Sequence, residues 1–245
     1  KTGAGLATIA TPRSCLPAIA RAMMELMTEP LEETPMKSVS VDAVTTAIKL
    51  LKGKNALVLG PGLSTHPSTA EFLRHLLPEI KIPAVIDADA LNIIASDPDM
   101  LAEVDGMPGP VVFTPHPGEF ARLAGRPIAE VLKHRLELAP AFAKEHGLFL
   151  VLKGYRTLIA DPDGRVFVNP TGNPGMASGG SGDVLSGMIA SQLAQERDVL
   201  GAVLSAVYVH GLSGDLGAES LSEKYLTAGD IIKFLPRALK ALENG

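Results

Sequence analysis

Residues 169–187 read N-P-T-G-N-P-G-M-A-S-G-G-S-G-D-V-L-S-G, a glycine-rich segment that leads into a helical pattern. The apolar residues Val184, Leu185 and Met188 have helical spacing, so we expect the helix to begin near Gly182. Glycine lets backbone N–H groups approach a ligand, and the first turn of a helix directs unpaired N–H groups and a positive dipole end the same way. The segment therefore predicts an anion site at a loop-to-helix junction.

Asp183 falls in the first turn of that helix, beside any bound phosphate. A bare carboxylate would repel phosphates, so its functional interpretation is a base that takes a proton from a substrate hydroxyl as that oxygen attacks phosphorus. The alternative is that Asp183 only complements the helix dipole, as acidic residues in first turns often do. The neighbouring glycines favour the functional interpretation.

The composition indicates one α/β domain. The chain has 245 residues, 46% of them hydrophobic, which is enough for a full core. Its net charge is −5 and its Lys and Arg residues are scattered, which disfavours nucleic-acid binding. We find no segment with the pattern of a membrane span or secretion signal, and the single cysteine, Cys15, suits a reducing compartment. We expect a cytoplasmic protein that does not bind a membrane.

Short apolar runs alternate with helical patterns in the first two thirds of the chain. The expected strands are 6–10, 56–59, 84–87, 111–114 and 149–152. The expected helices are 14–27, 41–52, 68–77, 117–124 and 128–146, with an exposed loop at 28–40. Nearly continuous apolar strands are typical of parallel strands covered on both faces. The pattern predicts a three-layer α/β/α fold with a mostly parallel central sheet.

The pattern changes after residue 154. Strands at 157–160 and 165–169 flank the turn residues D-P-D-G, which predicts an antiparallel hairpin appended to the sheet. The rest of the chain is expected to be helical. The helices are 182–195, 199–213 and a last helix to Leu242, opened by the capping pattern T-A-G-D at 227–230.

Polar motifs directly follow four of the expected strands. They are G-P-G-L-S at 60–64, D-A-D-A-L at 87–91, T-P-H-P-G-E at 114–119 and K-G-Y-R-T at 153–157. Ligands of open parallel sheets bind outside the carboxyl ends of the strands, so we expect all four motifs to border one cleft.

Several residues of these motifs have two interpretations. Gly60 and Gly62 serve either as turn residues or as points where a ligand touches backbone. Asp87 and Asp89 alternate on a strand end, so only one would face the cleft, and either could help hold Mg²⁺. His116, between two prolines, either contacts a substrate or caps a helix.

Two further side chains invite a choice between function and structure. Lys153 could reach a nucleotide phosphate or be a solvated surface lysine, and Gly154 to Thr157 offer backbone groups and a hydroxyl beside it. His210, on an otherwise apolar helix, is interpreted as a satisfied buried histidine. The G-x-x-x-x-G-K-[ST] signature is absent, and Leu185 interrupts a G-x-G-x-x-G pattern, so a P-loop NTPase or an ordinary Rossmann dehydrogenase is not indicated.

Five motifs spread over nearly the whole chain together resemble those of the ADP/ATP-dependent NAD(P)H-hydrate dehydratases, which belong to the ribokinase-like superfamily. They are the long glycine segment, T-P-H-P-G-E, K-G-Y-R-T, D-A-D-A-L and G-P-G-L. The resemblance implies repair of the S form of hydrated NADH or NADPH, in which a ring hydroxyl is phosphorylated and phosphate is then eliminated. It also implies Mg²⁺, ADP or ATP as phosphoryl donor, with ADP expected here, and a homo-oligomer, which in the family is a tetramer.

The resemblance assigns roles to matching positions. It implies that Gly62, His116 and Asp183 contact the hydrated dinucleotide, with Asp183 as the base. The residues implied to contact the adenine nucleotide are Lys153, Gly154, Tyr155, Arg156, Thr157 and Gly182.

Two departures from the family pattern stand out. Ser64 replaces a usual glycine, and Ser178 and Ser181 replace usual threonines, which are small changes. The motif T-G-A-G-L-A-T at 2–8 resembles the family's second strand, so we expect that the domain of residues 1–245 lacks the preceding strand and helix. The alternatives to a dehydratase are a ribokinase-like kinase of a small vitamin-precursor alcohol and a catalytically inactive nucleotide-binding module.

Overall fold

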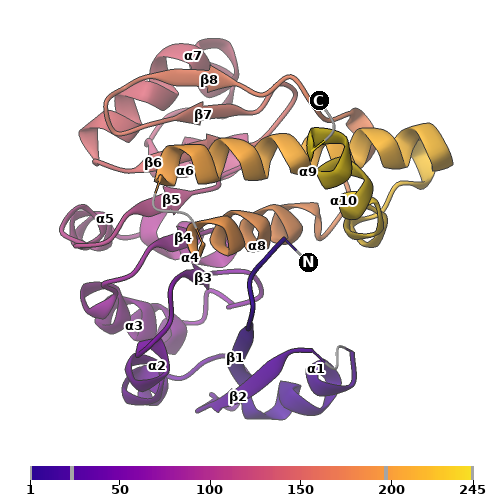
Figure 1. The fold of residues 1–245 in the computed structure, drawn as a ribbon. Helices are drawn as coiled ribbons and strands as arrows, with labels where there is room; N and C mark the ends of the chain where they lie inside the picture. The colour runs from indigo at the N-terminus through magenta and orange to yellow at the C-terminus, as the bar shows by residue number, and fades with distance from the viewer. Residues whose placement is uncertain (1, 23–24, 196–197, 244–245) are drawn as a thin grey trace.

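The computed structural model describes residues 2–22, 25–195 and 198–243. Its centre is a six-stranded sheet in the order β3-β4-β5-β6-β7-β8 (Figure 1). The strands are β3 (Leu57–Leu59), β4 (Ala84–Ile86), β5 (Val111–Phe113), β6 (Phe149–Leu152), β7 (Leu158–Ala160) and β8 (Val166–Val168). The first four are parallel, and β7 and β8 form the antiparallel hairpin. The predicted mostly parallel sheet with an appended hairpin is confirmed.

Helices cover both faces of this sheet, because alternate strand residues point to opposite sides. The helices on one face are α2 (Val44–Leu51), α3 (Pro67–Leu76), α4 (Ala88–Ala95), α5 (Pro98–Asp105), α6 (Pro117–Leu123) and α7 (Ile128–Glu145). The helices on the other face are α8 (Ser181–Leu193), α9 (Val199–Leu221) and α10 (Ala228–Glu243). Each face has its own apolar core: the first core lies between the sheet and α2 to α7, and the second between the sheet and α8 to α10. In β4, Ile86 belongs to the first core and Val85 to the second. The α/β/α layering is thus confirmed (Figure 1).

Two helices that were not expected from the sequence, α4 and α5, follow β4. Asp87 is not the end of a strand: β4 ends at Ile86, and Asp87 caps α4 with its own side chain. Asp89 lies in the first turn of α4. The expectation that these two aspartates alternate on a strand is therefore wrong, because a helix begins between them.

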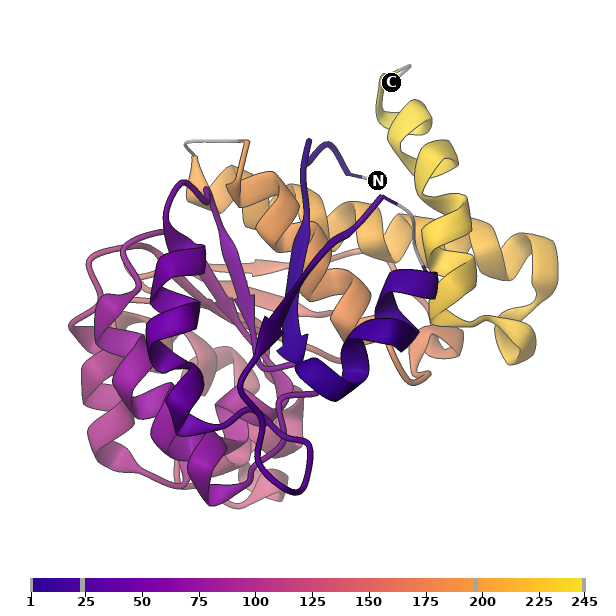
Figure 2. The ribbon, with the colours of Figure 1, turned by 90° about the horizontal axis from the view of Figure 1, so that it is seen from below.

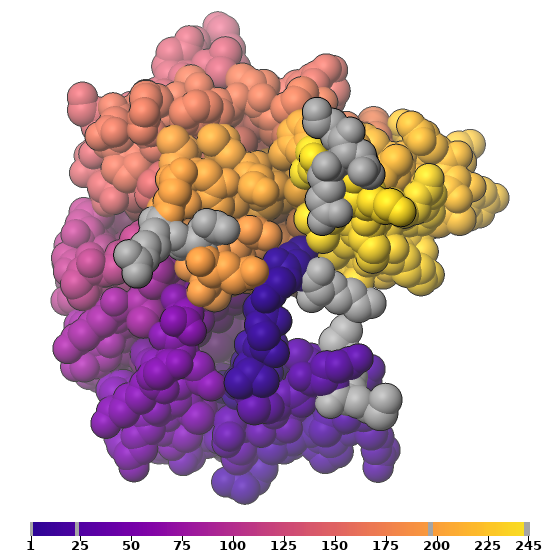
Figure 3. Space-filling view, in the orientation of Figure 1, coloured from indigo at the N-terminus to yellow at the C-terminus, as the bar shows by residue number. Residues whose placement is uncertain are grey.

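The first strands lie outside the main sheet. β1 (Thr8–Pro12) and β2 (Met27–Leu31) pair in parallel as a separate two-stranded sheet, joined through α1 (Leu16–Ala22) (Figure 2). The expected helix 14–27 is wrong at its end, since Met27 begins β2; residues 23–24 of that expectation lie outside the described residues. The segment before β1 is tied to α8, because the Gln192 amide and the Ser191 hydroxyl bond to the backbone of Thr2 and Ala4. Figure 3 shows this segment running from α8 down to β1.

The expected exposed loop at 28–40 is wrong in part: residues 32–37 are mostly exposed and form a turn, but the two ends of the segment are not an exposed loop. Its first part is β2, and Leu31 and Val39 are buried in the first core. The hydroxyls of Thr34 and Ser38, both buried, bond to each other at 2.9 Å. Prolines in this stretch suggested exposure, but the segment folds back to close the core beside α3.

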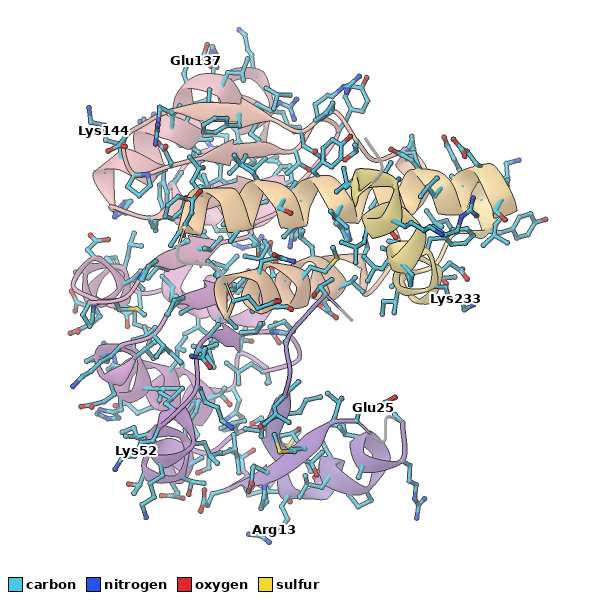
Figure 4. All side chains as sticks on the ribbon, in the orientation of Figure 1. Arg13, Glu25, Lys52, Glu137, Lys144 and Lys233 are labelled. Carbon is cyan, nitrogen blue, oxygen red and sulfur yellow. The ribbon has the colours of Figure 1, made fainter. Side chains whose placement is uncertain are left out.

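α9 is longer than the expected 199–213. Its length and mean hydropathy of 1.4 would suffice for a membrane span, contrary to the expectation from the sequence, but half of that apolar window is buried within the protein. It packs between the sheet, α8 and α10, as the core helix of a layered fold does. Charged side chains such as Arg13, Lys52, Glu137 and Lys144 project outward from the protein, the last two from α7 (Figure 4).

Candidate active site

A cavity of about 570 Å³ opens where β5 and β6 end and α8 begins. Four parts of the chain line it: His116 and Pro117, the loop 153–157, much of the segment 169–178, and one side of α8 and α9. The glycine-rich segment, two strand ends and two helices therefore meet around one open cavity. Two of the four predicted strand-end motifs, T-P-H-P-G-E and K-G-Y-R-T, contribute to its lining.

The junction of the glycine-rich segment with α8 is built as the sequence predicts. Gly180 has φ +85°, a left-handed conformation that glycine adopts without strain, and α8 begins at Ser181, one residue before the expected start. Gly182 lines the cavity in the first turn. Because first-turn N–H groups have no acceptor within their own helix, this end of α8 offers donors and a positive dipole end to an anion.

A buried polar network lies beneath this first turn. The Lys153 ammonium donates to Asp87 Oδ1 at 2.8 Å, and Asp87 is 1% exposed. The Ser186 hydroxyl, in the second turn of α8, donates to Asp87 Oδ2 at 2.6 Å. Thr114, at the end of β5, lies 3.3 Å from the Ser186 hydroxyl. The ends of three neighbouring strands are thereby joined to α8.

Of the two alternatives for Lys153, the solvated surface lysine is wrong, whereas contact with a nucleotide phosphate stays a prediction. It is not a solvated surface lysine, because it forms an ion pair with a buried carboxylate, and it also lines the cavity. A Cβ atom on Gly182 would lie 3.3 Å from its ammonium, so the two residues are in contact. Its charge is held against the first turn of α8.

Asp183 follows Gly182 and is exposed, although it is not among the residues that line the cavity. Partial burial raises the pKa of its carboxyl, the negative charge of Asp87 raises that pKa further, and the Lys153 ammonium opposes both effects. A carboxylate whose pKa is raised is a stronger base at neutral pH than an ordinary one. The environment thus makes Asp183 more suited to accept a proton.

His116 lines the cavity and also caps α6, so the capping alternative describes its present contacts. Its Nδ1 accepts from the backbone N–H groups of Gly118 at 3.0 Å and Glu119 at 3.2 Å. The Glu119 carboxylate accepts in return from the His116 backbone at 2.7 Å, completing a capping box. Since Nδ1 is an acceptor, the proton of the neutral ring sits on Nε2. About half of the side chain is exposed, so a ligand can still reach it.

The loop 153–157 is braced from two sides. The Arg135 guanidinium donates to the Tyr155 carbonyl at 2.8 Å, and the Arg156 guanidinium donates to the Pro170 carbonyl at 2.7 Å. The Tyr155 side chain is 75% exposed. Arg156 has φ +56°, a strained conformation for a residue with a side chain. All five predicted residues of this loop line the cavity.

The other two strand-end motifs do not line the cavity. A Cβ atom on Gly60 would meet the Asp87 carbonyl at 1.8 Å, so this glycine permits close packing of two loops. Ser64 has φ +73°, and its N–H donates to the Asp89 carboxylate at 2.7 Å. Gly62 has φ +66° and is not a lining residue. The expectation that all four motifs border one cleft is therefore corrected: two of them line the cavity and two lie outside its lining.

α9 contributes lining residues that the sequence reasoning missed or treated as structural, namely Val207, His210 and Gly211. His210 is buried, and its Nε2 lies 3.1 Å from the Ser181 carbonyl, which can only accept, so Nε2 carries the proton. Burial lowers the pKa of His210 to about 4. A Cβ atom on Gly211 would meet the Thr171 hydroxyl at 2.2 Å. The glycines at 211, 214 and 217 were the available signal, since their spacing indicates a close-packed helix face.

One lining residue has an unsatisfied group. The Ser178 hydroxyl is buried without a hydrogen-bond partner among the described residues. Buried polar groups are usually paired, so an unpaired one in a cavity wall indicates a place for a ligand atom or a water.

Within the described part of the chain, no three His, Cys, Asp or Glu residues are arranged to hold a metal ion. The two aspartates considered for Mg²⁺ are otherwise engaged: Asp87 with Lys153 and Ser186, and Asp89 with Ser64. These residues therefore do not form a protein-only Mg²⁺ site.

The layered α/β fold places a glycine-rich helix start at the wall of the cavity, an arrangement typical of proteins that bind phosphate groups. The model of the NAD(P)H-hydrate dehydratase family matches residues 1–237. The chain belongs to this family.

Individual relatives agree. The chain is 46% identical over 244 residues to a bifunctional NAD(P)H-hydrate repair enzyme Nnr of Moorella thermoacetica, covering all of this chain and 46% of the relative. It is 40% identical over 188 residues to an ADP-dependent (S)-NAD(P)H-hydrate dehydratase of Bacillus subtilis, covering 77% of this chain and 65% of the relative. The chain thus spans about half to two thirds of the length of these curated relatives.

The fold is shared with a solved structure. The ADP/ATP-dependent NAD(P)H-hydrate dehydratase from Bacillus subtilis, co-crystallised with ATP/Mg²⁺, superposes with a TM-score of 0.80 at 34% identity, covering 98% of this chain and 80% of that one. The predicted ribokinase-like fold is confirmed by this and more distant structural likenesses.

Proposed function

We propose that this chain dehydrates the S form of hydrated NADH or NADPH at the expense of ADP or ATP. The observation that carries the proposal is the position of Asp183 at the start of α8, next to Gly182 in the cavity wall and within the electrostatic influence of Lys153. A base, a helix N-terminus and a cation at one point are the parts that phosphoryl transfer to a hydroxyl requires.

The reaction divides into two steps. In the first, Asp183 takes the proton of the ring hydroxyl as its oxygen attacks the terminal phosphorus of the nucleotide, and the bond from that phosphorus to the bridging oxygen breaks. In the second, the carbon–oxygen bond of the phosphorylated ring breaks, phosphate leaves, and a ring proton is lost as the double bond forms. With ADP the products are AMP, phosphate and NADH or NADPH, so that the water of hydration ends in phosphate.

Different parts of the site would serve the two ligands. We assign the adenine nucleotide to the cavity itself, against Lys153 to Thr157 and Gly182, which all line it. We assign the hydrated dinucleotide to the side of His116, with Asp183 between the two ligands and Gly62 at the far edge. The donor atom of His116 is Nε2, because its Nδ1 is already an acceptor; Nε2 also lies 3.4 Å from Glu119 Oε1, so a ligand would share this donor with Glu119 or displace it.

Mg²⁺ is proposed as a companion of the nucleotide and not as a resident of the protein. Mg²⁺ usually keeps several waters and binds through substrate phosphates, which suits a chain whose described residues supply no three-ligand site. Bound in this way it would neutralise charge on the phosphates. We favour ADP as donor, since a relative of similar sequence carries ADP dependence in its name.

We further propose that residues 1–245 form one ribokinase-like domain of a cytoplasmic homo-oligomer, as in the tetramers of the family. Exposed apolar side chains on α7 support the association: Ile128, Leu132 and Leu136 are each more than half exposed, the first two one turn apart before the kink at His134 and the third just after it. Light scattering on the purified protein would give its mass in solution, and a monomer would contradict the association.

The test of the function is incubation of the protein with hydrated NADH, Mg²⁺ and either ADP or ATP. We expect the absorbance of reduced nicotinamide to return, with one phosphate released for each NADH formed. No return of absorbance with either nucleotide would refute the dehydratase. A stable phosphorylated product would instead indicate a small-molecule kinase, and nucleotide binding without any turnover would indicate an inactive binding module.

A further inference from the structure

Asp87 is a buried charge that the proposed reaction does not use directly. Both of its oxygens are occupied: Oδ1 accepts from Lys153 and from the Ala88 N–H, each at 2.8 Å, and Oδ2 accepts from Ser186 at 2.6 Å. An ionised carboxylate that is 1% exposed is costly unless it is paired and fully hydrogen-bonded. This one is both, and its partners come from the end of β6, the start of α4 and α8.

We propose that Asp87 is a positioning residue for phosphoryl transfer, which through Lys153 and Ser186 fixes the ammonium group and the first turns of α8 relative to the Asp183 carboxylate. The inference rests on the proposed function and names a residue that acts on the reaction without touching the substrate. A Cβ atom on Gly182 would lie 3.3 Å from the Lys153 ammonium and 3.8 Å from Asp87 Oδ2, so the ion pair packs directly against the turn that bears Asp183.

The geometry gives Asp87 two separable effects. Its hydrogen bond to Ser186 fixes the depth and rotation of α8, and with it the direction of the first-turn N–H groups. Its negative charge balances the Lys153 ammonium, which would otherwise act on Asp183 unopposed. The first effect is mechanical and the second is electrostatic, so different substitutions distinguish them.

The electrostatic effect has a defined sign. The charged groups that act on Asp183 are Asp87 from the end of β4, which raises its pKa, and Lys153 from the end of β6, which lowers it. His210, which approaches the same turn from α9, is neutral at neutral pH because its pKa is about 4. Loss of the Asp87 charge therefore lowers the pKa of Asp183 and makes it a weaker base.

The test compares Asp87→Asn with a matched control, Asp161→Asn. Asp161 is also 1% exposed and is also paired with one cation, Arg165 at 2.6 Å, but it lies at the opposite end of the sheet because β7 runs antiparallel to β6. For Asp87→Asn we expect kcat to fall about tenfold or more, with a smaller rise in KM for the nucleotide. We also expect the acidic limb of the profile of kcat/KM against pH to move to lower pH.

The control, Asp161→Asn, should lose thermal stability. It should retain the wild-type kcat and the wild-type acidic limb of the profile of kcat/KM against pH. An Asp87→Asn enzyme with an unmoved acidic limb, or with kcat within about twofold of the control, would overturn the inference. If Asp87→Asn does not fold, Ser186→Ala decides: it keeps the charge and removes the 2.6 Å hydrogen bond. For Ser186→Ala we expect a several-fold loss of kcat, with the acidic limb of the profile of kcat/KM against pH at its wild-type position. A wild-type kcat in this variant would overturn the inference.

A measurement without turnover separates this inference from the proposed function. The carboxyl carbon of Asp183 can be titrated by NMR in protein carrying ¹³C-labelled aspartate, with Asp183→Asn used to assign the signal. We expect a lower titration midpoint in Asp87→Asn than in the wild type. This result holds even if hydrated NADH is not the substrate, whereas equal midpoints would refute the electrostatic effect of Asp87 even in an active dehydratase.

Discussion

The imidazole of His210 donates from Nε2 to the carbonyl of Ser181, 3.1 Å away, and so ties the middle of α9 to the first residue of α8. This contact lies under the cavity wall, where both residues are lining residues. The position of the anion site thus depends on a core histidine as well as on the glycine-rich segment. The ring is neutral at neutral pH, since burial lowers the pKa of His210 to about 4.

The stability of the protein should therefore fall in mild acid. A histidine whose pKa drops from 6.5 in the unfolded chain to about 4 in the folded one contributes stability above pH 6.5 and loses it as the pH falls toward 4. The loss is up to about 3 kcal/mol at the lower end. Chemical denaturation of the wild type and His210→Gln across this range would measure it. Glutamine can still donate to Ser181 but cannot titrate, so parallel curves for the two proteins would contradict the prediction.

Gly211→Ala should damage the cavity wall. The added methyl group would meet the Thr171 hydroxyl at 2.2 Å and the Gly172 nitrogen at 2.9 Å, so the segment that follows Asn169 must move. We expect weaker nucleotide binding by calorimetry and a loss of stability of about 1–3 kcal/mol from overpacking. Gly187→Ala is the matched control in a helix, since nothing lies within 4 Å of its added atom. It should gain up to about 1 kcal/mol from helix propensity, and equal behaviour of the two variants would count against this account.

Asp183 should cost the folded protein stability at neutral pH. Because the folded state raises its pKa, the stabilisation from this group is complete below its ordinary value of 3.8 and is lost as the pH rises through the raised value. Asp183→Asn removes that dependence. We expect the variant to unfold at a higher temperature than the wild type near pH ~8, with the difference shrinking toward pH ~4. A variant that is less stable at pH ~8 would show that helix-dipole complementation outweighs the unfavourable environment.

Much of the fold could be predicted because the buried strands are short, apolar and regularly spaced. The sheet, its hairpin and the helices on either face follow from that pattern, and the start of α8 follows from Gly180 and Gly182. What could not be predicted depended on local polar contacts. Asp87 looked like the end of a strand, yet its side chain caps α4. Residues 28–40 looked exposed because of their prolines, although contacts distant in sequence bury Leu31 and Val39.

The site shows the same division. The order of the motifs brought Lys153, Gly182 and His116 to one cavity, since parallel strands end on one side of a sheet. The contribution of α9 could not be read from its sequence, because an apolar helix with one histidine looks like any core helix. Likewise, nothing in D-A-D-A-L indicates that Asp87 pairs with Lys153, 66 residues later, because the pair exists only when β4 and β6 are aligned through β5.

The most direct test of the central claim is the comparison of turnover and nucleotide affinity in Asp183→Asn. If Asp183 is the base that takes the hydroxyl proton, kcat of the variant for hydrated NADH should fall by a factor of about 10² to 10⁴. Its affinity for AMP by calorimetry should stay near that of the wild type, because the cavity is lined by other residues. Turnover near the wild-type rate, with affinity unchanged, would contradict the assignment of Asp183 as the base.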